Sequence, residues 1–335
     1  MAVPAVVAAG DRGAAKAIHG ESKAFLEIEG RTLVAHVVAQ LQRVPEVSEV
    51  WVVGDAARLE PVLRPELDGE LTKPLHVLPQ FDDLLANMWE SYRRVLPGAG
   101  SEGREPAGRE DEQQWVLYLS GDLPFATPQE ISSFIQRSQA LPCDYALGLC
   151  TEAAMAPFHA DSPTAPGIRM ASFNLREGRY RQTNLHLVKP GLLANRTSIE
   201  EMYRNRHQQE LSQIVKLGWG LLRREGGGFA VIWYFALMHL AGLADRRGWR
   251  RAADMIRRWT PIARVERGCS ALLGTRCRFS VTDVGGCALD IDTEEDFDVA
   301  SLRFREWRAA QEERAESLHG PLPLPATAGE RTGSS

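Results

Sequence analysis

The sequence predicts an α/β protein in which helices flank a mostly parallel mixed sheet and a helical insertion interrupts the second half. Short apolar stretches alternate with helical segments through the first half of the chain, and several of them end in Gly, Ser or Asp. Residues 198–259 are mostly helical in pattern and exceed what such a sheet requires. With 335 residues, 44% of them hydrophobic, the chain can bury a large core and carry an appended subdomain.

The first predicted strand, Val3 to Ala9, runs into a loop of small residues. Backbone N–H groups of such a loop can close on an anion, because no bulky side chain holds a phosphate away. The loop matches neither the phosphate-binding loop that ends in Gly-Lys-Ser/Thr nor the dinucleotide fingerprint Gly-x-Gly-x-x-Gly. Its candidate nucleotide contacts are Ala8, Ala9, Gly10, Asp11 and Gly13.

The following elements continue the alternation of helix and strand. A helix is expected near residues 32–43, a strand over 50–53 and a short strand over 76–79. From Asp83 to Leu96 apolar residues recur at spacings of three and four, which predicts a helix capped by Asp82 or Asp83. Residues 97–114 are rich in glycine and charge, so we expect a disordered insertion there.

A buried strand over residues 115–119 is followed by Ser120-Gly121-Asp122-Leu123-Pro124-Phe125. Thr127 then caps a helix that begins with Pro128. Open α/β sheets bind ligands in the crevice at the carboxyl ends of their strands, where a Mg²⁺ that bridges nucleotide phosphates is held. Asp122 is therefore a candidate magnesium ligand.

A second acidic segment lies far along the chain, from Cys287 to Phe297, where a strand is expected to run into a helix. Thr293 and Asp296 can form a capping box at the start of that helix. In extended backbone Asp290 and Asp292 point to the same face, while Ile291 packs the other way. Both carboxylates can approach one cation, although Asp292 also fits a purely electrostatic role at a helix start.

Three segments of this chain resemble the nucleotidyltransferases that have a molybdenum cofactor guanylyltransferase-like NTP transferase domain. The family begins with Ala-Gly-x-Gly-x-Arg and Pro-Lys-x-Leu, and later carries Gly-Asp-x-Pro-Phe and Asp-x-Asp-Thr-x-Glu-Asp. In this chain Arg12 precedes Gly13, and Ser22 replaces the proline before Lys23. The resemblance implies the Rossmann-like nucleotide-diphospho-sugar transferase fold. It also implies that Lys23 reaches the triphosphate, that Arg12, Lys16 or both replace the family's arginine, and that Asp290 or Asp292 gives the second metal contact.

The resemblance further implies regions for the base and the acceptor. A nucleotide-contacting loop corresponds to residues 80–87, which makes Gln80 and Asn87 candidates for base recognition. Strands are expected over 144–149, 169–175 and 180–188, and the last two correspond to the acceptor region. The candidate acceptor contacts are Arg169, Asn184, His186 and Lys189. A polar residue that alternates with apolar ones also fits the solvated face of a strand.

The predicted domains are a core over 1–195, a helical subdomain over 196–265, a return to the core over 266–316, and a disordered tail over 317–335.

The apolar run 229–244 is shorter than the roughly 20 residues that span a bilayer. We expect a buried core helix or a homodimer interface there, with peripheral membrane contact as the alternative. Residues 196–278 contain sixteen Lys or Arg and only seven Asp or Glu. This excess of positive charge fits a solvated surface or an anionic partner.

Composition excludes several classes of protein. The net charge of −5 gives no reason to expect nucleic acid as a partner. Five cysteines without paired short spacing argue against structural zinc and a disulfide framework, and fit a reducing cytoplasm. The apolar N-terminal run lacks a basic leading segment, so we interpret it as a strand and not as a signal peptide. No transmembrane segment is expected.

The sequence thus predicts a Mg²⁺-dependent nucleotidyltransferase. A phosphate oxygen of a phosphorylated small-molecule acceptor would attack the α-phosphorus of a nucleoside triphosphate and expel pyrophosphate. A nucleotide-sugar-dependent glycosyltransferase of similar fold is an alternative, because Asp290-Ile291-Asp292 also reads as Asp-x-Asp; its position after the acceptor region disfavours it. The other alternative is a non-catalytic nucleotide-binding scaffold. The base and the acceptor stay open.

Overall fold

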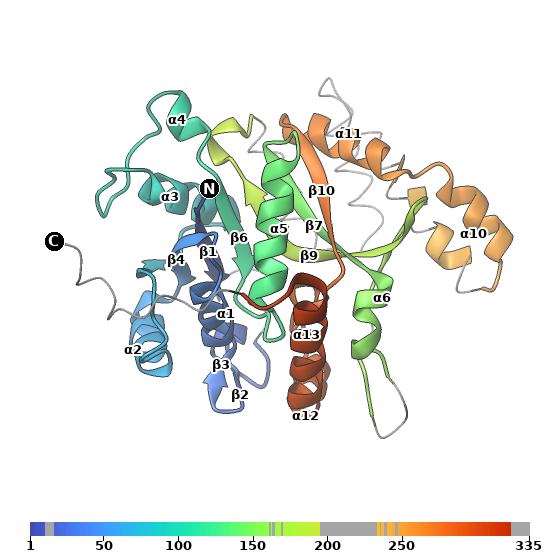
Figure 1. Ribbon diagram of the computed structural model, residues 1–335, viewed down its shortest axis with the longest axis horizontal. Helices are drawn as coiled ribbons and strands as arrows, with labels where there is room; N and C mark the ends of the chain where they lie inside the picture. The colour runs from blue at the N-terminus through green and yellow to red at the C-terminus, as the bar shows by residue number, and fades with distance from the viewer. Residues whose placement is uncertain are drawn as a thin grey trace.

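The computed structural model describes residues 1–10, 17–160, 162, 165–168, 170–194, 233–234, 236–237, 240–244 and 247–322. A sheet of eight strands organises this part of the chain (Figure 1). Its strands are Val3–Ala9 (β1), Val47–Gly54 (β4), Leu75–Pro79 (β5), Val116–Ser120 (β6), Tyr145–Thr151 (β7), Phe173–Leu175 (β8), Gly178–Val188 (β9) and Cys277–Thr282 (β10). A separate small sheet pairs Glu27–Ile28 (β2) with Arg31–Thr32 (β3).

The strand order is β10-β7-β9-β6-β1-β4-β5, and β8 pairs with β9. Strands β5, β4, β1 and β6 are mutually parallel, and so are β7 and β10. Strand β9 lies between these two groups and runs antiparallel to both β6 and β7. The predicted mostly parallel mixed sheet flanked by helices is therefore confirmed.

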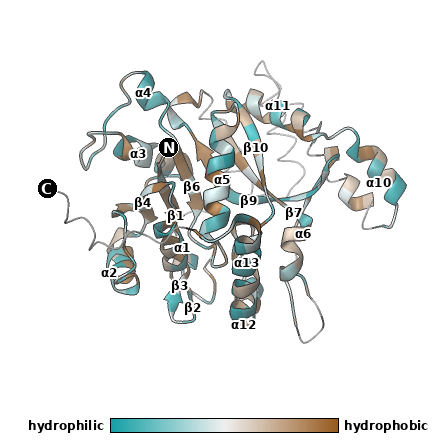
Figure 2. Cartoon of the chain, viewed as in Figure 1, coloured by the Kyte–Doolittle hydropathy of each residue, from teal (hydrophilic) through white to brown (hydrophobic). Residues whose placement is uncertain are grey.

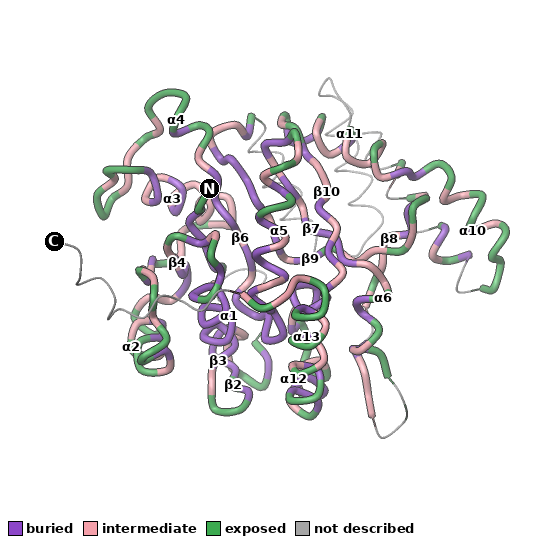
Figure 3. Tube along the Cα trace, in the orientation of Figure 1, coloured by how far each residue is buried: buried purple, intermediate pink, exposed green. Residues whose placement is uncertain are grey.

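Helices cover the two faces of the sheet. Alternate residues of β1 divide between them: Ala5 and Val7 are buried in the main apolar core, whereas Val6 packs in a second cluster with Tyr92. The first face carries Leu33–Gln42 (α1), Ala56–Glu66 (α2) and Pro128–Ala140 (α5), and the second carries Leu84–Val95 (α3) and Ile262–Leu273 (α11). The central strands are hydrophobic and mostly buried in Figures 2 and 3, as expected for strands covered on both sides.

The predicted helix starts are confirmed. The side chain of Asp83, not that of Asp82, caps α3 by accepting a hydrogen bond from the N–H of Ala86. Thr127 caps α5 by accepting from the N–H of Glu130. These side chains satisfy N–H groups that the first turn of a helix leaves without a partner.

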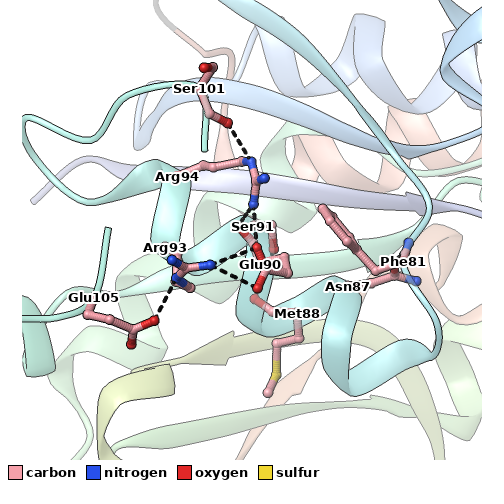
Figure 4. A network of polar contacts seen from close by, with 9 residues as sticks. All are labelled: Phe81, Asn87, Met88, Glu90, Ser91, Arg93, Arg94, Ser101 and Glu105. Carbon is pink, nitrogen blue, oxygen red and sulfur yellow. Dashed lines mark hydrogen bonds and ion pairs between the residues drawn. The ribbon is translucent and has the colours of Figure 1, made fainter. Parts of the chain in front are cut away.

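Residues 97–114, for which we expected disorder, are folded in the structure (Figure 4). They include a short helix, Arg109–Glu112 (α4). Arginines of α3 hold the segment: Arg94 Nε donates to the carbonyl of Ser101 at 2.9 Å, and Arg93 Nε lies 2.9 Å from Glu105 Oε1. Asp111 accepts from Arg104 and from the N–H of Ala107. Polar contacts thus fix a segment for which the sequence offers little apolar surface, and Ala99 adds a contact with the apolar cluster around Tyr92.

The C-terminal part returns to the first face of the core. Glu294–Leu302 (α12) and Phe304–His319 (α13) follow each other, and Trp307 is fully buried with its ring centroid 5.6 Å from Phe125 and 5.2 Å from Phe158. Helix α13 continues to His319, so residues 317–319 of the expected disordered tail are helical.

The predicted helical subdomain falls largely outside the described residues. Its described parts are helical at 240–244 and in Arg250–Arg257 (α10), and α11 crosses the predicted boundary at 265. The other short elements are Glu152–Met155 (α6) and 3-10 turns at Lys23–Phe25 (η1), Ala156–Phe158 (η2), Pro190–Leu192 (η3) and Gly286–Ala288 (η4). Within the described chain, every helix is too short or too polar to cross a bilayer.

The strand expected before α12 is absent from the described structure, where η4 and unpaired extended backbone occupy residues 286–292. A Cβ on Gly286 would lie 1.9 Å from the carbonyl oxygen of Phe125, so only glycine fits this approach. The N–H of Cys287 donates to the Glu130 carboxylate of α5 at 3.0 Å. These contacts to α5 and to the residues just before it replace the pairing of a sheet.

Candidate active site

Asp122 lies where β6 ends, beside the end of β1. Ala8 of β1 pairs with Ser120 of β6, and the N–H of Gly121 donates to the carbonyl of Ala8 at 2.9 Å. The Ser120 hydroxyl donates to Asp122 Oδ1. Parallel pairing thus brings the predicted nucleotide loop after β1 and the predicted metal ligand after β6 to one edge of the sheet.

The second acidic segment reaches the same place. The N–H of Ile291 donates to the carbonyl oxygen of Asp122 at 3.3 Å, and the Ile291 side chain is fully buried. Because Ile291 points into the core, Asp290 and Asp292 extend on the other side of this backbone. The structure therefore brings Asp122 together with Asp290 and Asp292, which follow it by 168 and 170 residues along the chain.

Lys23, at the start of η1, connects these carboxylates. Its Nζ lies 2.6 Å from Asp292 Oδ1 and 3.8 Å from Asp122 Oδ2. The Lys23 side chain is mostly buried, whereas the Asp292 side chain is 57% exposed. An ammonium that neighbours two carboxylates at the edge of a sheet can exchange one of them for the phosphate oxygens of a ligand.

Negative charge is concentrated around Asp122. Burial, followed by the nearby Asp290 carboxylate, raises the pKa of Asp122 to about 6, while the Lys23 ammonium opposes the rise. Asp290 has its own partner, because Arg181 Nη2 lies 3.0 Å from Asp290 Oδ1. Among the described residues, the cations near Asp122 only partly offset the like charges of the site.

This donor set fits a magnesium ion that shares its coordination with substrate. Among the described residues, no group of three or more His, Cys, Asp or Glu side chains can hold a metal by itself. Mg²⁺ at phosphate-transfer sites commonly takes one or two carboxylates and fills the remaining positions with phosphate oxygens and water. Asp122 and Asp290 are the pair whose mutual repulsion such a cation would relieve.

Two residues that position Asp290 were not predicted from the sequence. Arg181 of β9 donates through Nε to the carbonyl of Ala288 at 2.6 Å and also contacts Asp290. Glu130 of α5 is fully buried and accepts from Cys287 N–H and from the Thr282 hydroxyl at 3.4 Å. Burial raises the pKa of Glu130 to about 8. Acidic residues are common in the first turn of a helix, and Glu130 lies in the first turn of α5. Its local sequence therefore does not indicate that it contacts the segment of Asp290.

The turn before Lys23 is fastened to α12. His19 has a left-handed φ of 50° between Ile18 and Glu21, whose backbones pair. Its N–H donates to Glu294 Oε1 at 3.1 Å, and its Nε2 lies 2.9 Å from Asp298 Oδ1. The segment that carries Lys23 is thus held against the helix that follows Asp292.

The structure describes only part of the predicted nucleotide loop. Ala8, Ala9 and Gly10 end β1 at the site. A Cβ on Gly10 would lie 2.8 Å from Gln80 Cδ, so Gln80 lies directly over Gly10. Asn87 is farther along, in α3, where its side-chain oxygen accepts from the N–H of Phe81 at 2.7 Å (Figure 4). The predicted contacts Asp11, Arg12, Gly13 and Lys16 lie outside the described residues.

Among the described residues, the predicted acceptor contacts do not form one group. Because β9 is antiparallel, Lys189 follows it at the opposite edge of the sheet, where it is buried 3.1 Å from Asp144 Oδ1 and stacks over Trp115. His186 lies within β9 with Nδ1 2.8 Å from the Tyr145 hydroxyl, and Asn184 is half-buried on the same strand. Arg169 lies outside the described residues. Lys189 is therefore not brought to the site.

Parts of this chain are similar in sequence to known proteins. Residues 5–190, more than half of it, match the family model described as the MobA-like NTP transferase domain. A 2-C-methyl-D-erythritol 4-phosphate cytidylyltransferase of Chlorobium luteolum is 24% identical over 119 residues, which are 36% of this chain and 47% of that protein. The chain thus matches about half the length of this curated relative.

The fold also has a solved counterpart. A hypothetical transferase from Thermus thermophilus aligns with a TM-score of 0.56 and 23% sequence identity, covering 88% of this chain and 99% of that one. At this level of identity the likeness concerns the fold alone. It agrees with the mostly parallel sheet flanked by helices.

Proposed function

Because this chain belongs to the nucleotidyltransferase family with a MobA-like NTP transferase domain, we propose that it transfers a nucleoside monophosphate from a nucleoside triphosphate to a phosphorylated small molecule. The observation that carries the proposal is the meeting of Asp122, Asp290 and Lys23 beside the end of β1. Such a group suits a polyphosphate that arrives with a divalent cation.

The reaction is an in-line displacement at phosphorus. An oxygen of the acceptor phosphate forms a bond to the α-phosphorus, the bond from that phosphorus to the β-phosphate oxygen breaks, and pyrophosphate leaves with the electron pair. An acceptor phosphate is already anionic, so the chain does not need to supply a general base. What it must supply is the placement of two anions that repel each other and the neutralisation of their charge.

The described residues divide these tasks. Asp122 and Asp290 would hold Mg²⁺, which when bound offsets charge on the triphosphate. Lys23 can turn from Asp292 to a phosphate oxygen, since the exposed Asp292 loses little by returning to water. Arg181 and Glu130 keep Asp290 in place from β9 and α5.

The relative from Chlorobium luteolum suggests which substrates to try first. By its name it is a cytidylyltransferase for the phosphate of a sugar-alcohol derivative. CTP with polyol phosphates and sugar phosphates therefore comes first, followed by the other three nucleoside triphosphates and by pterin and lipid-precursor phosphates.

The test is pyrophosphate release by the full chain with Mg²⁺ and each pair of nucleotide and acceptor. We expect release with one nucleotide and one class of acceptor, and a loss of roughly a hundredfold or more in Asp122→Asn, the usual cost of losing one electrostatic contact at a transferring group. Asp68→Asn is the matched control, because Asp68 is an exposed residue after α2. It should leave the rate unchanged.

Two results would contradict the proposal. Nucleotide binding that depends on Mg²⁺, with no pyrophosphate released for any acceptor, would favour the non-catalytic scaffold. Transfer of a sugar from a nucleotide sugar, with a nucleotide as the leaving group, would favour the glycosyltransferase.

A further inference from the structure

The helical region beyond β8 presents large apolar side chains to solvent and buries small ones. In α10 and the helical residues 240–244, the buried side chains are Ala241, Ala244 and Ala253. Trp249, Met255 and Trp259 are each 60% exposed. A helix of a globular protein normally buries its large apolar residues and exposes the small or polar ones. Here the arrangement is reversed.

The preceding helical residues show the same reversal. Trp233 and Leu240 are each 52% exposed, and Leu243 is 41% exposed. The sequence predicted a buried core helix or a dimer-interface helix over 229–244, and these side chains are not in the core of the described structure. Large apolar residues gathered on one exposed region commonly mark an interaction surface.

Arginines lie beside the apolar residues of 247–259 in the sequence, and the Arg247 guanidinium lies over the Trp249 ring. Arg247, Arg250, Arg251 and Arg258 are all exposed, and Arg251, Met255 and Arg258 share one face of α10 by their spacing. From 247 to 259 the chain has five arginines and one aspartate, a net charge of +4. We call the exposed side chains Trp249, Met255, Trp259, Arg247, Arg250, Arg251 and Arg258 the Trp/Arg surface. In Figure 2 the hydrophilic colour of α10 reflects its arginines.

The Trp/Arg surface is attached firmly to the core through β8. Arg257 Nη2 donates to the side-chain oxygen of Asn174 at 3.1 Å, and the Thr260 hydroxyl donates to the Asn174 carbonyl at 3.2 Å. A Cβ on Gly242 would lie 2.9 Å from Asn174 Nδ2, so the helix of residues 240–244 rests on the same residue. Helix α10 projects at the end of the molecule opposite α2 (Figure 1).

We propose that the Trp/Arg surface binds the anionic surface of a lipid bilayer. Tryptophan and methionine can enter the boundary between headgroups and acyl chains, while arginines at the same level pair with lipid phosphates. Each basic residue near an anionic leaflet adds to the attraction. A second copy of the chain fits less well, since a two-fold contact would set this positive surface against itself.

The experiment is sedimentation of the full chain with vesicles of phosphatidylcholine alone and of phosphatidylcholine with phosphatidylserine, at low and high salt. We expect binding to the vesicles that contain phosphatidylserine, and weaker binding at high salt. Arg250→Glu/Arg251→Glu should lower the apparent affinity at least about tenfold. Trp249→Ala/Trp259→Ala should lower it too, because insertion contributes apolar burial.

Matched controls separate the surface from general effects. Arg43→Glu/Arg64→Glu makes the same charge change at the C-cap of α1 and on α2, away from α10, and Leu302→Ala/Leu318→Ala removes exposed apolar residues elsewhere. Both should bind like the unmodified chain. Circular dichroism melting curves show whether each variant is folded.

Three results would overturn the proposal. One is absence of binding to the vesicles that contain phosphatidylserine. Another is a dimer in solution that the tryptophan variant dissociates, which would make the surface a contact between copies. The third is duplex DNA binding that the arginine variant abolishes and the tryptophan variant does not, which would indicate a binder of polyanions. None of these readouts depends on nucleotidyl transfer.

Discussion

Asp122 has a different electrostatic environment from the other acids of the site. It is buried, its Oδ1 accepts from Ser120, and its Oδ2 lies 3.8 Å from Lys23 Nζ. Asp290 and Asp292 both raise its pKa, after burial itself. An ionised carboxylate that is buried near other carboxylates destabilises the ligand-free protein. A bound cation would neutralise its charge and remove this cost.

This environment predicts that Asp122→Asn stabilises the ligand-free protein at neutral pH. The pKa of Asp122 is about 6 in the folded protein, against a usual value of 3.8, so stability is lost as pH rises between these values. Above pH 6 the asparagine variant should be more stable by about 3 kcal/mol, and the difference should become small as the pH falls to about 4. Denaturant unfolding at both pH values measures this.

The exposed Asp68→Asn change again provides the control, with no difference at either pH expected. An Asp122→Asn variant that is less stable than the unmodified chain at both pH values would show that its contacts with Ser120 and Lys23 outweigh the cost of burying its charge.

Among the elements, the segment of η4 and the residues up to Asp292 depend most on long-range contacts. Glu130 at the start of α5 holds Cys287, and Arg181 in β9 holds Ala288. The segment makes no strand pairs with the part of the chain that the structure describes, and its end is fixed by the capping box of Thr293 and Asp296. The position of Asp290 is therefore set by one helix and one strand that are distant in sequence.

Glu130 should make the stability of the protein depend on pH. Its pKa is raised from a usual 4.5 to about 8, so the folded protein keeps a proton that the unfolded chain has released. The free energy of unfolding should fall as pH rises from about 5 to about 8. Glu130→Gln resembles the protonated acid and should flatten this decline, which denaturant unfolding across that range would show.

Because Asp122 contributes to the same trend, the comparison is the difference in slope between Glu130→Gln and the unmodified chain. The control Glu313→Gln changes an exposed acid of α13 and should keep the slope. An unchanged slope in Glu130→Gln would mean that Glu130 is ionised in the folded protein.

Across the whole molecule, the antiparallel insertion of β9 decides what meets at the site. It carries Arg181 to the carboxyl edge of the parallel strands and leaves Lys189 at the other edge, bonded to Asp144 and Gln113. Arg181 in β9 and Lys189 just after it are only eight positions apart, yet they lie at opposite ends of the sheet, because a strand rises about 3.3 Å per residue.

Lys189→Met should therefore affect stability and not acceptor binding. It leaves the buried Asp144 with Arg276, whose side chain is 63% exposed, as its remaining charged partner among the described contacts. We expect a loss of about 3 kcal/mol in unfolding free energy and an unchanged KM for the acceptor. The double variant Lys189→Met/Asp144→Asn should recover part of the loss. A raised KM with normal stability would restore Lys189 as an acceptor contact.

Local rules explain what could be predicted from the sequence. Apolar runs and turn residues located the strands of the first half, side-chain caps located the starts of α3, α5 and α12, and a strand end identified the position of Asp122. Each of these depends on residues a few positions apart, which act through hydrogen bonds and periodicity within one element. The α/β class and its mostly parallel sheet followed from them.

The sequence by itself determined the elements, their caps and the types of residue at the strand ends. Only the tertiary structure decided that Lys23 contacts Asp292, that Arg181 and Glu130 position the segment of Asp290, that residues 97–114 fold onto α3, and that Lys189 faces away from the site. The physical reason is that these contacts join residues from different elements. Their formation depends on strand order, strand direction and burial, which no short stretch of sequence specifies.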